Sequence, residues 1–425
     1  MIPAPPASIA ALLARPVAVL GAGVSGQGVL ALLAALGARG ILYDKKADGA
    51  QRSFTPSVAS GHGLVVFSPG FAAEHPWLAT ARAAGCTCVG ELDFASLFWR
   101  GELVAITGTN GKTTLTEFLA HALNAAGRRA FATGNVGYPF SRFVVEQAGR
   151  TDIAVCEVSS FQAETLRYLR PDATLWANLA EDHLERHRDM EAYFTAKWQL
   201  VERTPLKAVF LGASAWSHAV GFPHNIRHLP PSALVESKGQ PADARLAGTV
   251  FASYPQHENF LLAAAWWRYA GLSEATLFEA ARTFKLGAHR LGRVGEKAGV
   301  TFWNDSKATN FHAVEAALAT FAAPVLWIGG GKAKGGDIET FVHRIACRIK
   351  HAFLIGETSA ELAGQCRAVQ VPATLCAGLA EAVRAAFALA RPGDHVLLSP
   401  GFASFDQFRG YDDRGRQFES LVGNL

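Results

Sequence analysis

The sequence lacks long apolar runs, and only two of its cysteines, Cys86 and Cys88, are close together. No stretch reaches the roughly eighteen uninterrupted apolar residues that a membrane helix needs, and no basic segment precedes the first apolar one, so we expect neither a membrane span nor a secretion signal. The six cysteines are scattered, and none has the Cys-x-x-Cys spacing of many metal sites. This pattern favours reduced thiols over disulfides and predicts a cytoplasmic protein.

A strong net charge is also absent. The chain has 40 Lys and Arg residues against 36 Asp and Glu residues, mixed along its length, and a net charge of +4. This excess is too small to indicate a nucleic-acid partner, although it suits anionic small molecules. Half of the 425 residues are hydrophobic, and the length exceeds what one core usually serves, so we expect two to four domains.

Strand-like apolar segments alternate with Ala- and Leu-rich helical segments from end to end, without a low-complexity tract. This alternation indicates an α/β architecture with mainly parallel sheets. Three such units follow one another, and we predict that they span residues 1–100, 101–286 and 287–425.

A glycine-bounded turn between a strand-like segment (103–106) and a helical one (115–125) predicts an ATP-phosphate site. Its glycines allow a tight turn with inward N–H groups, Lys112 brings a cation to the β- and γ-phosphates, and the Thr113 hydroxyl can hold Mg2+. The spacing is two residues shorter than in the common phosphate loop, and a chance glycine turn is the alternative. The predicted residues are Gly108, Thr109, Asn110, Gly111, Lys112, Thr113 and Thr114.

The first unit carries a Gly-x-Gly-x-x-Gly motif at Gly21, Gly23 and Gly26, between a strand-like segment at 17–20 and a second one that ends at Asp44. In this arrangement the helix N-terminus meets a diphosphate and the acid meets a ribose hydroxyl. The motif alone leaves NAD, FAD and other diphosphate ligands open. A further strand and turn at 65–70 can add backbone donors to the same crevice.

Glu157 and His183 sit at or just beyond the ends of two strand-like segments, 153–157 and 173–177, which we predict to be neighbours. A carboxylate and an imidazole there can bind a divalent metal that bridges ATP to an acceptor. The alternatives are a helix-capping acid for Glu157 and ordinary solvent exposure for His183. From the sequence alone, Lys197 on the predicted helix 189–202 is a solvated surface lysine.

The third unit holds several polar turns at expected strand ends. His289 and Arg290 supply cations that could reach a transferring phosphoryl group if the domains closed. Asp305 and Lys307 follow the predicted strand 300–304, and a Gly- and Lys-rich turn contains Lys334. Each of these side chains could instead be a surface turn residue, but such turns recur at strand ends in all three units.

Taken together, these motifs resemble those of the Mur ligases of peptidoglycan synthesis, and the resemblance spans nearly the whole chain. Two C-terminal segments discriminate best, because they look like the member that adds D-glutamate. The resemblance implies a Rossmann-like domain whose glycine motif binds a UDP-sugar, a central P-loop ATPase domain and a C-terminal Rossmann-like domain. The motifs are Gly108-Thr-Asn-Gly-Lys-Thr113, Gly134-Asn-Val-Gly137, Glu157-Val-Ser-Ser-Phe-Gln162, Asn178 through Glu181-Asp-His183, His289-Arg290, Asn304-Asp-Ser-Lys-Ala-Thr-Asn310 and Leu398-Ser-Pro-Gly-Phe-Ala-Ser-Phe-Asp-Gln-Phe408.

The resemblance also implies a reaction. The alanyl carboxylate of UDP-N-acetylmuramoyl-L-alanine attacks the γ-phosphate of ATP, and the amine of D-glutamate then displaces phosphate from the acyl phosphate. Phosphorylation comes first because an unactivated carboxylate would have to expel oxide. Both steps build negative charge, which Mg2+, Lys112 and a helix N-terminus are expected to stabilise. We expect a monomer that binds these small molecules and neither nucleic acid nor membrane.

The roles implied by the resemblance fall on particular residues of this sequence. The catalytic residues are Lys112, Asn135, Glu157, His183 and Lys197. Two Mg2+ ions are expected at Thr113, Glu157, His183 and Lys197. Lys197 matches a lysine that CO2 carbamylates, which turns a cation into a carboxylate-like ligand and requires a neutral amine at the moment of reaction.

The substrate-binding positions are implied in the same way. The ATP-side positions beyond the phosphate loop are Asn259, Arg290, Asp305 and Lys307. The UDP-sugar positions are Val24, Ser25, Asp44, Lys45, Ser68, Gly70 and Asn135. The D-glutamate positions are His289, which also matches a domain-closure position, Thr309, Lys334, Ser404 and Tyr411.

The chain departs from the family pattern in two places. The adenine-contacting His-Asn-x-x-Asn appears as Pro255-Gln-His-Glu-Asn259, so that Gln256 stands for the first asparagine. After Asp44, Lys45-Lys46 replaces a common Thr-Arg pair and keeps the positive potential.

Three alternatives stay open. A sibling ligase could add another amino acid, although no Asp-Asn-Pro-Arg-like motif of the diamino-acid ligases occurs. An oxidoreductase using NAD or FAD would explain the glycine motif but not the phosphate loop. A non-catalytic nucleotide switch would leave Glu157, His183 and Lys197 without a common purpose.

Overall fold

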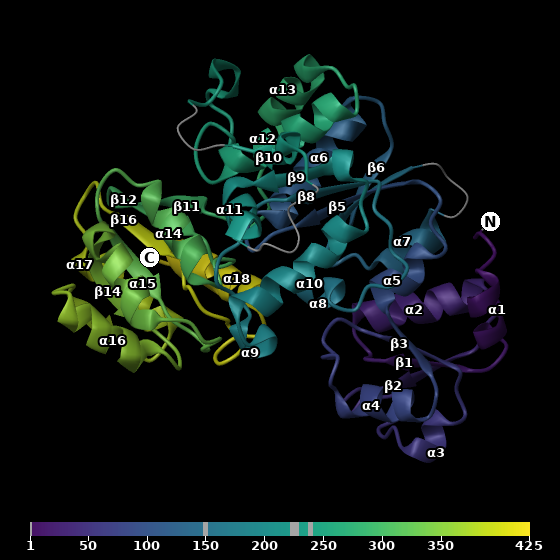
Figure 1. Cartoon of the computed structure of the whole chain (residues 1–425). Coiled ribbons are helices and arrows are strands. Elements are labelled where there is room, and N and C mark those ends of the chain that lie inside the picture. Colours follow the sequence, from purple (N-terminus) through teal and green to yellow (C-terminus); the bar gives the residue numbers. More distant parts are fainter. Residues whose placement is uncertain (1, 148–151, 222–228, 237–240) are drawn as a thin grey trace. The chain divides into compact units, whose positions relative to one another are not determined.

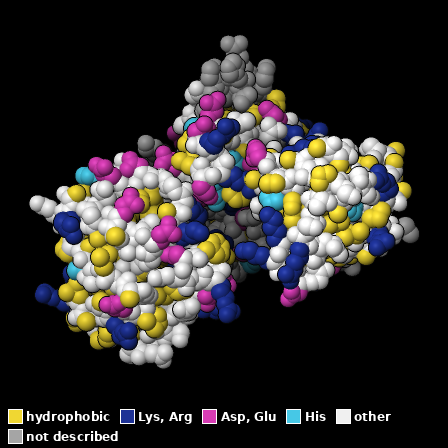
Figure 2. Space-filling model, turned by 90° about the horizontal axis from the view of Figure 1, so that it is seen from below, with side chains coloured by type: hydrophobic (Ala, Val, Ile, Leu, Met, Phe, Trp, Pro, Cys, Tyr) yellow, Lys and Arg dark blue, Asp and Glu magenta, His cyan; other side chains and the backbone are white. Residues whose placement is uncertain are grey.

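The computed structural model describes residues 2–147, 152–221, 229–236 and 241–425, and it confirms the α/β architecture (Figure 1). The described strands form three sheets, whose strand pairs are parallel except for one in the third sheet. Basic and acidic side chains are interspersed on the face shown in Figure 2, as the balanced composition predicts. Within the described residues, no helix combines the length and apolar character needed to cross a lipid bilayer.

The first sheet has the strand order β2-β1-β3-β4. Its central strands β1 and β3 are apolar and buried throughout, which is typical of parallel strands covered on both faces. A Cβ at Gly26 would lie 1.8 Å from the Gly21 carbonyl oxygen, so glycine allows α2 to start close against β1. The elements are α1 (Ala7–Leu13), β1 (Val17–Leu20), α2 (Val24–Ala35), β2 (Gly40–Tyr43), α3 (Pro56–Ala59), β3 (Leu64–Phe67), α4 (Pro76–Ala83), β4 (Thr87–Gly90) and α5 (Glu91–Ser96).

The second sheet has the order β10-β9-β8-β5-β7-β6, with β5 near its centre. Its strands are β5 (Glu102–Thr107), β6 (Ala130–Gly134), β7 (Ile153–Glu157), β8 (Ala173–Trp176), β9 (Val209–Gly212) and β10 (Leu234–Val235). The helices in this part of the chain are α6 (Lys112–Ala125), α7 (Phe140–Glu146), α8 (Ser160–Ala163), α9 (Leu184–His187), α10 (Met190–Glu202), α11 (Ala213–Gly221), α12 (Gln256–Tyr269) and α13 (Glu274–Thr283).

Buried acids on α5 attach the first sheet to the second. The Asp93 carboxylate accepts hydrogen bonds from the backbone N–H groups of Arg167, Tyr168 and Leu169 at 2.7–2.8 Å. Glu91 accepts one from the Ser141 N–H at 2.7 Å, at the start of α7. One apolar core runs through both sheets and includes residues of β1, β3, β5 and β7. These contacts place the first two sheets in one packed body.

The third sheet has the order β11-β12-β16-β13-β14-β15, with β11 antiparallel to β12. Its strands are β11 (Gly292–Lys297), β12 (Val300–Asn304), β13 (Val325–Gly329), β14 (Ile349–Leu354), β15 (Ala373–Leu375) and β16 (His395–Leu398). Its helices are α14 (Phe311–Ala319), α15 (Ile338–Ile345), α16 (Ser359–Ala368), α17 (Leu379–Leu389) and α18 (Tyr411–Gly423). Separate apolar cores, one containing Trp327 and the other Phe302, pack against this sheet.

The chain forms two compact units. The first comprises residues 1–179, 191–249 and 256–284, and therefore contains the first two sheets. The second comprises residues 180–190, 250–255 and 285–425. The short segment that carries His183 thus packs with the third sheet, although it lies far from that sheet in the sequence. Domain boundaries near residues 101 and 287 stay a prediction.

Candidate active site

The predicted phosphate loop connects β5 to α6. Gly108 and Gly111 have φ angles of +147° and +79°, in the region that favours glycine. At Gly111 a Cβ would also lie 2.7 Å from Asn259 Oδ1, so a side chain there has no room. Because α6 starts at Lys112, its first N–H groups and the positive end of its dipole face this turn. The loop fits the phosphates of ATP.

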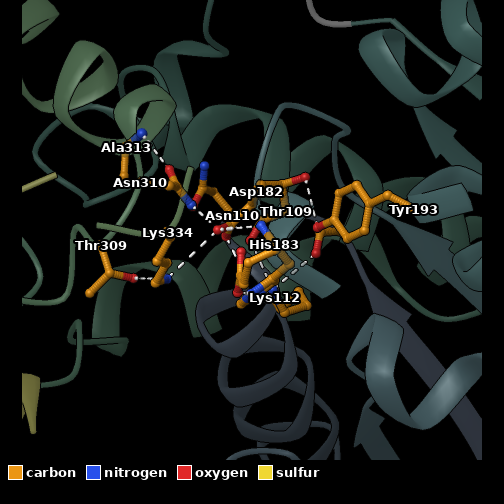
Figure 3. A network of polar contacts seen from close by, with 12 residues as sticks. Thr109, Asn110, Lys112, Asp182, His183, Tyr193, Thr309, Asn310, Ala313 and Lys334 are labelled. Atoms are coloured by element: carbon orange, nitrogen blue, oxygen red, sulfur yellow. Dashed lines mark hydrogen bonds and ion pairs between the residues drawn. The ribbon is translucent and has the colours of Figure 1, made fainter. Parts of the chain in front are cut away.

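Side chains hold this loop in place. Lys112 Nζ donates hydrogen bonds to the carbonyl oxygens of Gly108 at 2.9 Å and Thr109 at 2.8 Å, so its ammonium group lies over the loop (Figure 3). Asn178, just after β8, accepts from the Asn110 N–H at 2.9 Å and donates to its carbonyl oxygen at 3.2 Å. Asn178 is the first residue of one of the family motifs, but the sequence prediction did not name it as a site residue. Its position directly after a strand that flanks β5 was the available signal.

Glu157 ends β7 in a buried polar position. The residue is 3% exposed, and its Oε1 accepts a hydrogen bond from Asn135 Nδ2 at 2.9 Å. Its Oε2 is buried and has no hydrogen-bond partner among the described residues. The capping alternative is wrong, because Ser159 and Gln162 form the capping box of α8. Buried polar atoms normally have a hydrogen-bond partner, so a buried carboxylate oxygen without one fits a residue that binds a metal.

Lys197 is buried rather than solvated. It is 1% exposed, and its Nζ donates to the Gly108 carbonyl oxygen at 2.9 Å and lies 3.4 Å from Thr107 Oγ1. The ammonium group also lies 4.8 Å from the centre of the Tyr193 ring, whose hydroxyl is 3.2 Å from Thr109 Oγ1. The surface position inferred from sequence alone is therefore wrong. The structure brings Lys197 to the phosphate loop.

The residues that could hold Mg2+ are divided between the two units. Thr113 and Glu157 belong to the first unit and are buried, and His183 belongs to the second. The prediction that β7 and β8 are neighbours is wrong, because β5 lies between them and pairs with both. In the described part of the chain, no group of three or more His, Cys, Asp and Glu side chains has a metal-binding arrangement. Mg2+ commonly uses one or two carboxylates together with phosphates and water, so Thr113 and Glu157 fit this ion.

His183 is half-buried in the second unit. Its side chain is 31% exposed and lies 3.6 Å from Asp182 Oδ2 and 3.4 Å from Glu185 Oε1. Burial lowers the pKa of His183, and the Asp182 carboxylate opposes that shift. His183 also has a φ angle of +58°, an uncommon conformation for a residue with a Cβ.

The glycine motif of the first sheet forms a second candidate ligand site. The Asp44 carboxylate accepts backbone hydrogen bonds from Lys46 and Ala22 at 2.9 Å, and these bonds lower its pKa. Ser68 Oγ, at the end of β3, is buried and has no hydrogen-bond partner in the described part of the chain. The Lys45 ammonium group lies 5.6 Å from the centre of the Trp77 ring. An orphaned hydroxyl, a cation and a helix N-terminus suit a diphosphate ligand. Val24 and Ser25 begin α2, and Gly70 has open space around it.

A cluster around the buried Asp305 and His289 joins five predicted residues of the second unit. Asp305 Oδ2 accepts a hydrogen bond from Ser399 Oγ at 2.8 Å, and Oδ1 accepts one from the Leu291 N–H at 3.1 Å. The Lys307 N–H donates to the His289 carbonyl oxygen at 3.1 Å, and its ammonium group lies 5.0 Å from the centre of the Tyr411 ring. Arg290 contributes a positive charge near Asp305. These side chains are held together rather than scattered over surface turns.

Asp305 is expected to give this unit a pH-dependent stability. Burial raises its pKa to about 7, whereas an unfolded aspartate ionises near pH 4, so the folded protein holds the proton in this window. Stability from this group is complete below about pH 4 and is lost as the pH rises through about 7, by at most about 4 kcal/mol. Asp305→Asn, which carries no charge at any pH, should lack this loss. Urea unfolding at about pH 5 and about pH 8 measures this loss in the wild type and in Asp305→Asn. If the free energy of unfolding changed equally between the two pH values in both proteins, the assignment would be contradicted.

A pocket in the second unit contains two of the predicted amino-acid residues, Thr309 and Lys334 (Figure 3). Lys334 Nζ lies 3.4 Å from Thr309 Oγ1 and 3.7 Å from Asp182 Oδ1. Ser404 is buried and, with Tyr411, is not among the described residues that line this pocket. Asp182 was not predicted as a site residue, although it stands in the quoted Glu181-Asp-His183 motif.

Two stretches of the chain match models of known protein families. Residues 106–220 match the Mur ligase middle domain, and residues 289–402 match the Mur ligase glutamate ligase domain. The UDP-N-acetylmuramoylalanine--D-glutamate ligase of Gloeobacter violaceus is 36% identical over 96% of this chain and 99% of the relative. The protein of the same name from Caldanaerobacter subterraneus is 32% identical over 96% and 98%. The chain belongs to the Mur ligase family.

Solved Mur ligases share the fold of the chain. The UDP-N-acetylmuramate-alanine ligase MurC from Thermotoga maritima aligns with a TM-score of 0.61 at 14% identity and covers 96% of this chain and 99% of its own. The MurF ligase from the same organism, in complex with ADP, has a TM-score of 0.58 at 17% identity over 85% and 96%. Membership of the Mur ligases confirms the predicted three-domain α/β fold.

Proposed function

We propose that this Mur ligase uses ATP to join D-glutamate to UDP-N-acetylmuramoyl-L-alanine in the synthesis of a peptidoglycan precursor. Similarity over nearly the full length to proteins named UDP-N-acetylmuramoylalanine--D-glutamate ligase supports the choice of substrates. The observation that carries the chemistry is the buried Glu157, with its unpartnered oxygen, in the same unit as the phosphate loop. The pocket with Lys334 and Thr309 supplies a place for an amino-acid carboxylate.

The proposed reaction first converts the alanyl carboxylate into an acyl phosphate, with ADP as the leaving group. Attack by the amine then releases phosphate and forms the amide. Lys112 and the N-terminus of α6 stabilise the negative charge that builds on the transferring phosphoryl group, because both are fixed in place before the reaction. Asn135 holds the Glu157 carboxylate and thereby orients it.

Mg2+ fits this site, and Thr113 and Glu157 are the residues that would hold it. When bound, the ion neutralises phosphate charge and orients the reacting oxygens. We also propose His183 and a carbamylated Lys197 as metal ligands. The lysine carbamate forms when the neutral amine adds CO2 and releases a proton.

The remaining assignments belong to the same proposal. Three domains would span residues 1–100, 101–286 and 287–425 of a monomeric cytoplasmic enzyme. The glycine motif with Asp44 and Ser68 would bind the UDP-sugar, and Asn259, Arg290, Asp305 and Lys307 would contact ATP. Asn259 supports this role because it packs against Gly111 and its Nδ2 donates to Gln256 Oε1 at 2.8 Å.

An amino-acid selectivity assay tests the function directly. The protein is incubated with ATP, Mg2+, UDP-N-acetylmuramoyl-L-alanine and one of four amino acids: D-glutamate, L-glutamate, L-alanine or a diamino acid. We expect phosphate release with D-glutamate to exceed release with the others by at least about 100-fold, because buried charged groups reject ligands that leave them unpaired. The Lys112→Ala variant, which lacks the loop cation, is the control that assigns the activity to this chain. Preference for a diamino acid or L-alanine would overturn the proposal.

A further inference from the structure

Asn178 lies directly after β8 and contacts the phosphate loop through both its main chain and its side chain. Its carbonyl oxygen accepts a hydrogen bond from the Thr109 N–H at 3.0 Å. Its side-chain Oδ1 accepts from the Asn110 N–H at 2.9 Å, and its Nδ2 donates to the Asn110 carbonyl oxygen at 3.2 Å. The side-chain amide therefore pairs with both backbone polar groups of one loop residue.

These bonds continue the sheet beyond the ends of two strands. β5 and β8 pair in parallel up to Thr107 and Trp176, and the Ala177 N–H then donates to the Thr107 carbonyl oxygen at 2.9 Å. The bond from Thr109 to Asn178 follows in the same direction, and the amide of Asn178 adds two more. The loop is thus tied to the neighbouring strand end at the point where its own strand stops pairing.

Asn178 is itself held in place. The residue is 9% exposed, and its carbonyl oxygen also accepts from Trp176 Nε1 at 3.1 Å. The next N–H, that of Leu179, donates to Ser214 Oγ at 3.1 Å, near the start of α11. All of these partners are protein groups, so the clamp needs no nucleotide to form. An amide buried here would lose both of its bonds if it turned away from the loop, which favours the observed orientation.

The clamp also divides the main-chain donors of the loop. The N–H groups of Thr109 and Asn110 are directed to residue 178, so the donors that can bind phosphate oxygens come from Gly111 onward, at the start of α6. The position of those donors depends on how well the preceding residues are fixed. Asn178 fixes these residues from outside the loop.

We propose that Asn178 orders the phosphate loop in advance and thereby sets the affinity of the chain for its nucleotide. The inference rests on the proposed use of ATP at this loop and names a residue on which that use depends. A loop that is already ordered loses less conformational freedom when the nucleotide binds, so the apparent dissociation constant is lower. Asn178 acts through Asn110 and receives no contact with the nucleotide, so it is a positioning residue.

Binding of ADP with Mg2+ to the full chain, measured by calorimetry, tests this inference without the ligation reaction. Asn178→Ala should raise the dissociation constant of ADP about tenfold or more, because two hydrogen bonds to the loop are lost. Asn178→Leu keeps the size of the side chain but neither bond, and it should raise the constant as much. Wild-type affinity in Asn178→Leu would mean that the side chain only fills space, and would overturn the inference.

Asn124, near the other end of α6, gives a matched control. Its Oδ1 accepts from the Ala130 N–H at 3.3 Å and its Nδ2 donates to the Ala130 carbonyl oxygen at 2.7 Å, so it makes the same kind of pairing away from the loop. Asn124→Ala should lower the free energy of unfolding in urea, but should change the dissociation constant of ADP less than about twofold. An equal loss of affinity in Asn124→Ala and Asn178→Ala would assign the effect to general destabilisation and overturn the inference.

Hydrogen exchange and kinetics give two further readouts. The Asn110 amide should be protected in the nucleotide-free wild type and released in Asn178→Leu, and an unprotected amide in the wild type would overturn the inference. In the ligation assay Asn178→Leu should raise the KM for ATP about tenfold or more, with a smaller change in kcat and an unchanged KM for D-glutamate. A parallel rise of both KM values would mean a merely structural role. If ADP binds as expected but no amino acid is ligated, the proposed function fails and the role of Asn178 stands.

Discussion

The Lys197→Ala variant is expected to lose about 100-fold or more of its ATP-dependent ligation activity. Lys197 is one of the few charged side chains that are almost fully buried, and its ammonium group lies against the Gly108 carbonyl oxygen of the phosphate loop. A surface lysine would tolerate truncation, whereas this one reaches the place where phosphate charge must be neutralised. Phosphate release with D-glutamate, measured at saturating ATP, gives the loss directly.

Dependence on bicarbonate separates the proposed carbamate from a role of the ammonium group itself. Wild-type activity should fall in CO2-depleted buffer and return when bicarbonate is added, whereas the residual activity of Lys197→Ala should not respond. The exposed Lys207, on a short turn after α10, gives the matched control Lys207→Ala, which should behave as the wild type does. Full activity of Lys197→Ala would refute the metal-ligand role, and bicarbonate-independent wild-type activity would refute the carbamate.

Local elements of the fold were predictable because the responsible signals are short. The strands expected at 153–157 and 300–304 are present as β7 and β12, and the helix expected at 115–125 is the body of α6. The order of strands within a sheet was not predictable in the same way. The strand order depends on which strands pair across long loops. Nothing in the sequences of β7 and β8 indicates that β5 lies between them. The antiparallel strand β11 was not predicted, because most of its residues are polar or glycine and its side chains are exposed or half-buried.

The candidate site shows the same division. The phosphate loop carries its chemistry in consecutive residues, so spacing and glycine content were sufficient to predict it. Lys197 and Asp182 owe their surroundings to contacts with Gly108 and Lys334, which are distant in the sequence. The neighbours of Lys197 on α10, among them Tyr193 and Trp198, are buried, and that apolar surrounding was the one local indication that this lysine is not solvated. Burial of charge is a tertiary property, and only the resemblance to a family suggested it in advance.

Arg414 on α18 is expected to be the costliest side chain to replace in the second unit. It is 0% exposed, and burial lowers the pKa of its guanidinium to about 10, so it stays charged at neutral pH. Its nitrogens donate to Ser306 Oγ at 3.0 Å, to the Ser306 carbonyl oxygen at 2.9 Å and to the Phe402 carbonyl oxygen at 3.2 Å. These bonds connect the loop that carries Asp305 and Lys307 to the loop that follows β16.

Arg414→Met should therefore lower the free energy of unfolding by about 3 kcal/mol, because two buried carbonyl groups lose a charged donor. Arg414→Lys should restore little of this, since one ammonium group cannot copy the planar fork that reaches both carbonyls. Urea unfolding measures the loss, and hydrogen exchange of the amides at 305–307 and 401–404 shows whether these loops are the ones released. Arg416→Met is the matched control, because Arg416 lies two residues along the same helix and pairs with Asp412 at the surface. This substitution should lower the free energy of unfolding by less than about 0.5 kcal/mol. Equal stability of the two Met variants would show that Arg414 does not hold these loops together.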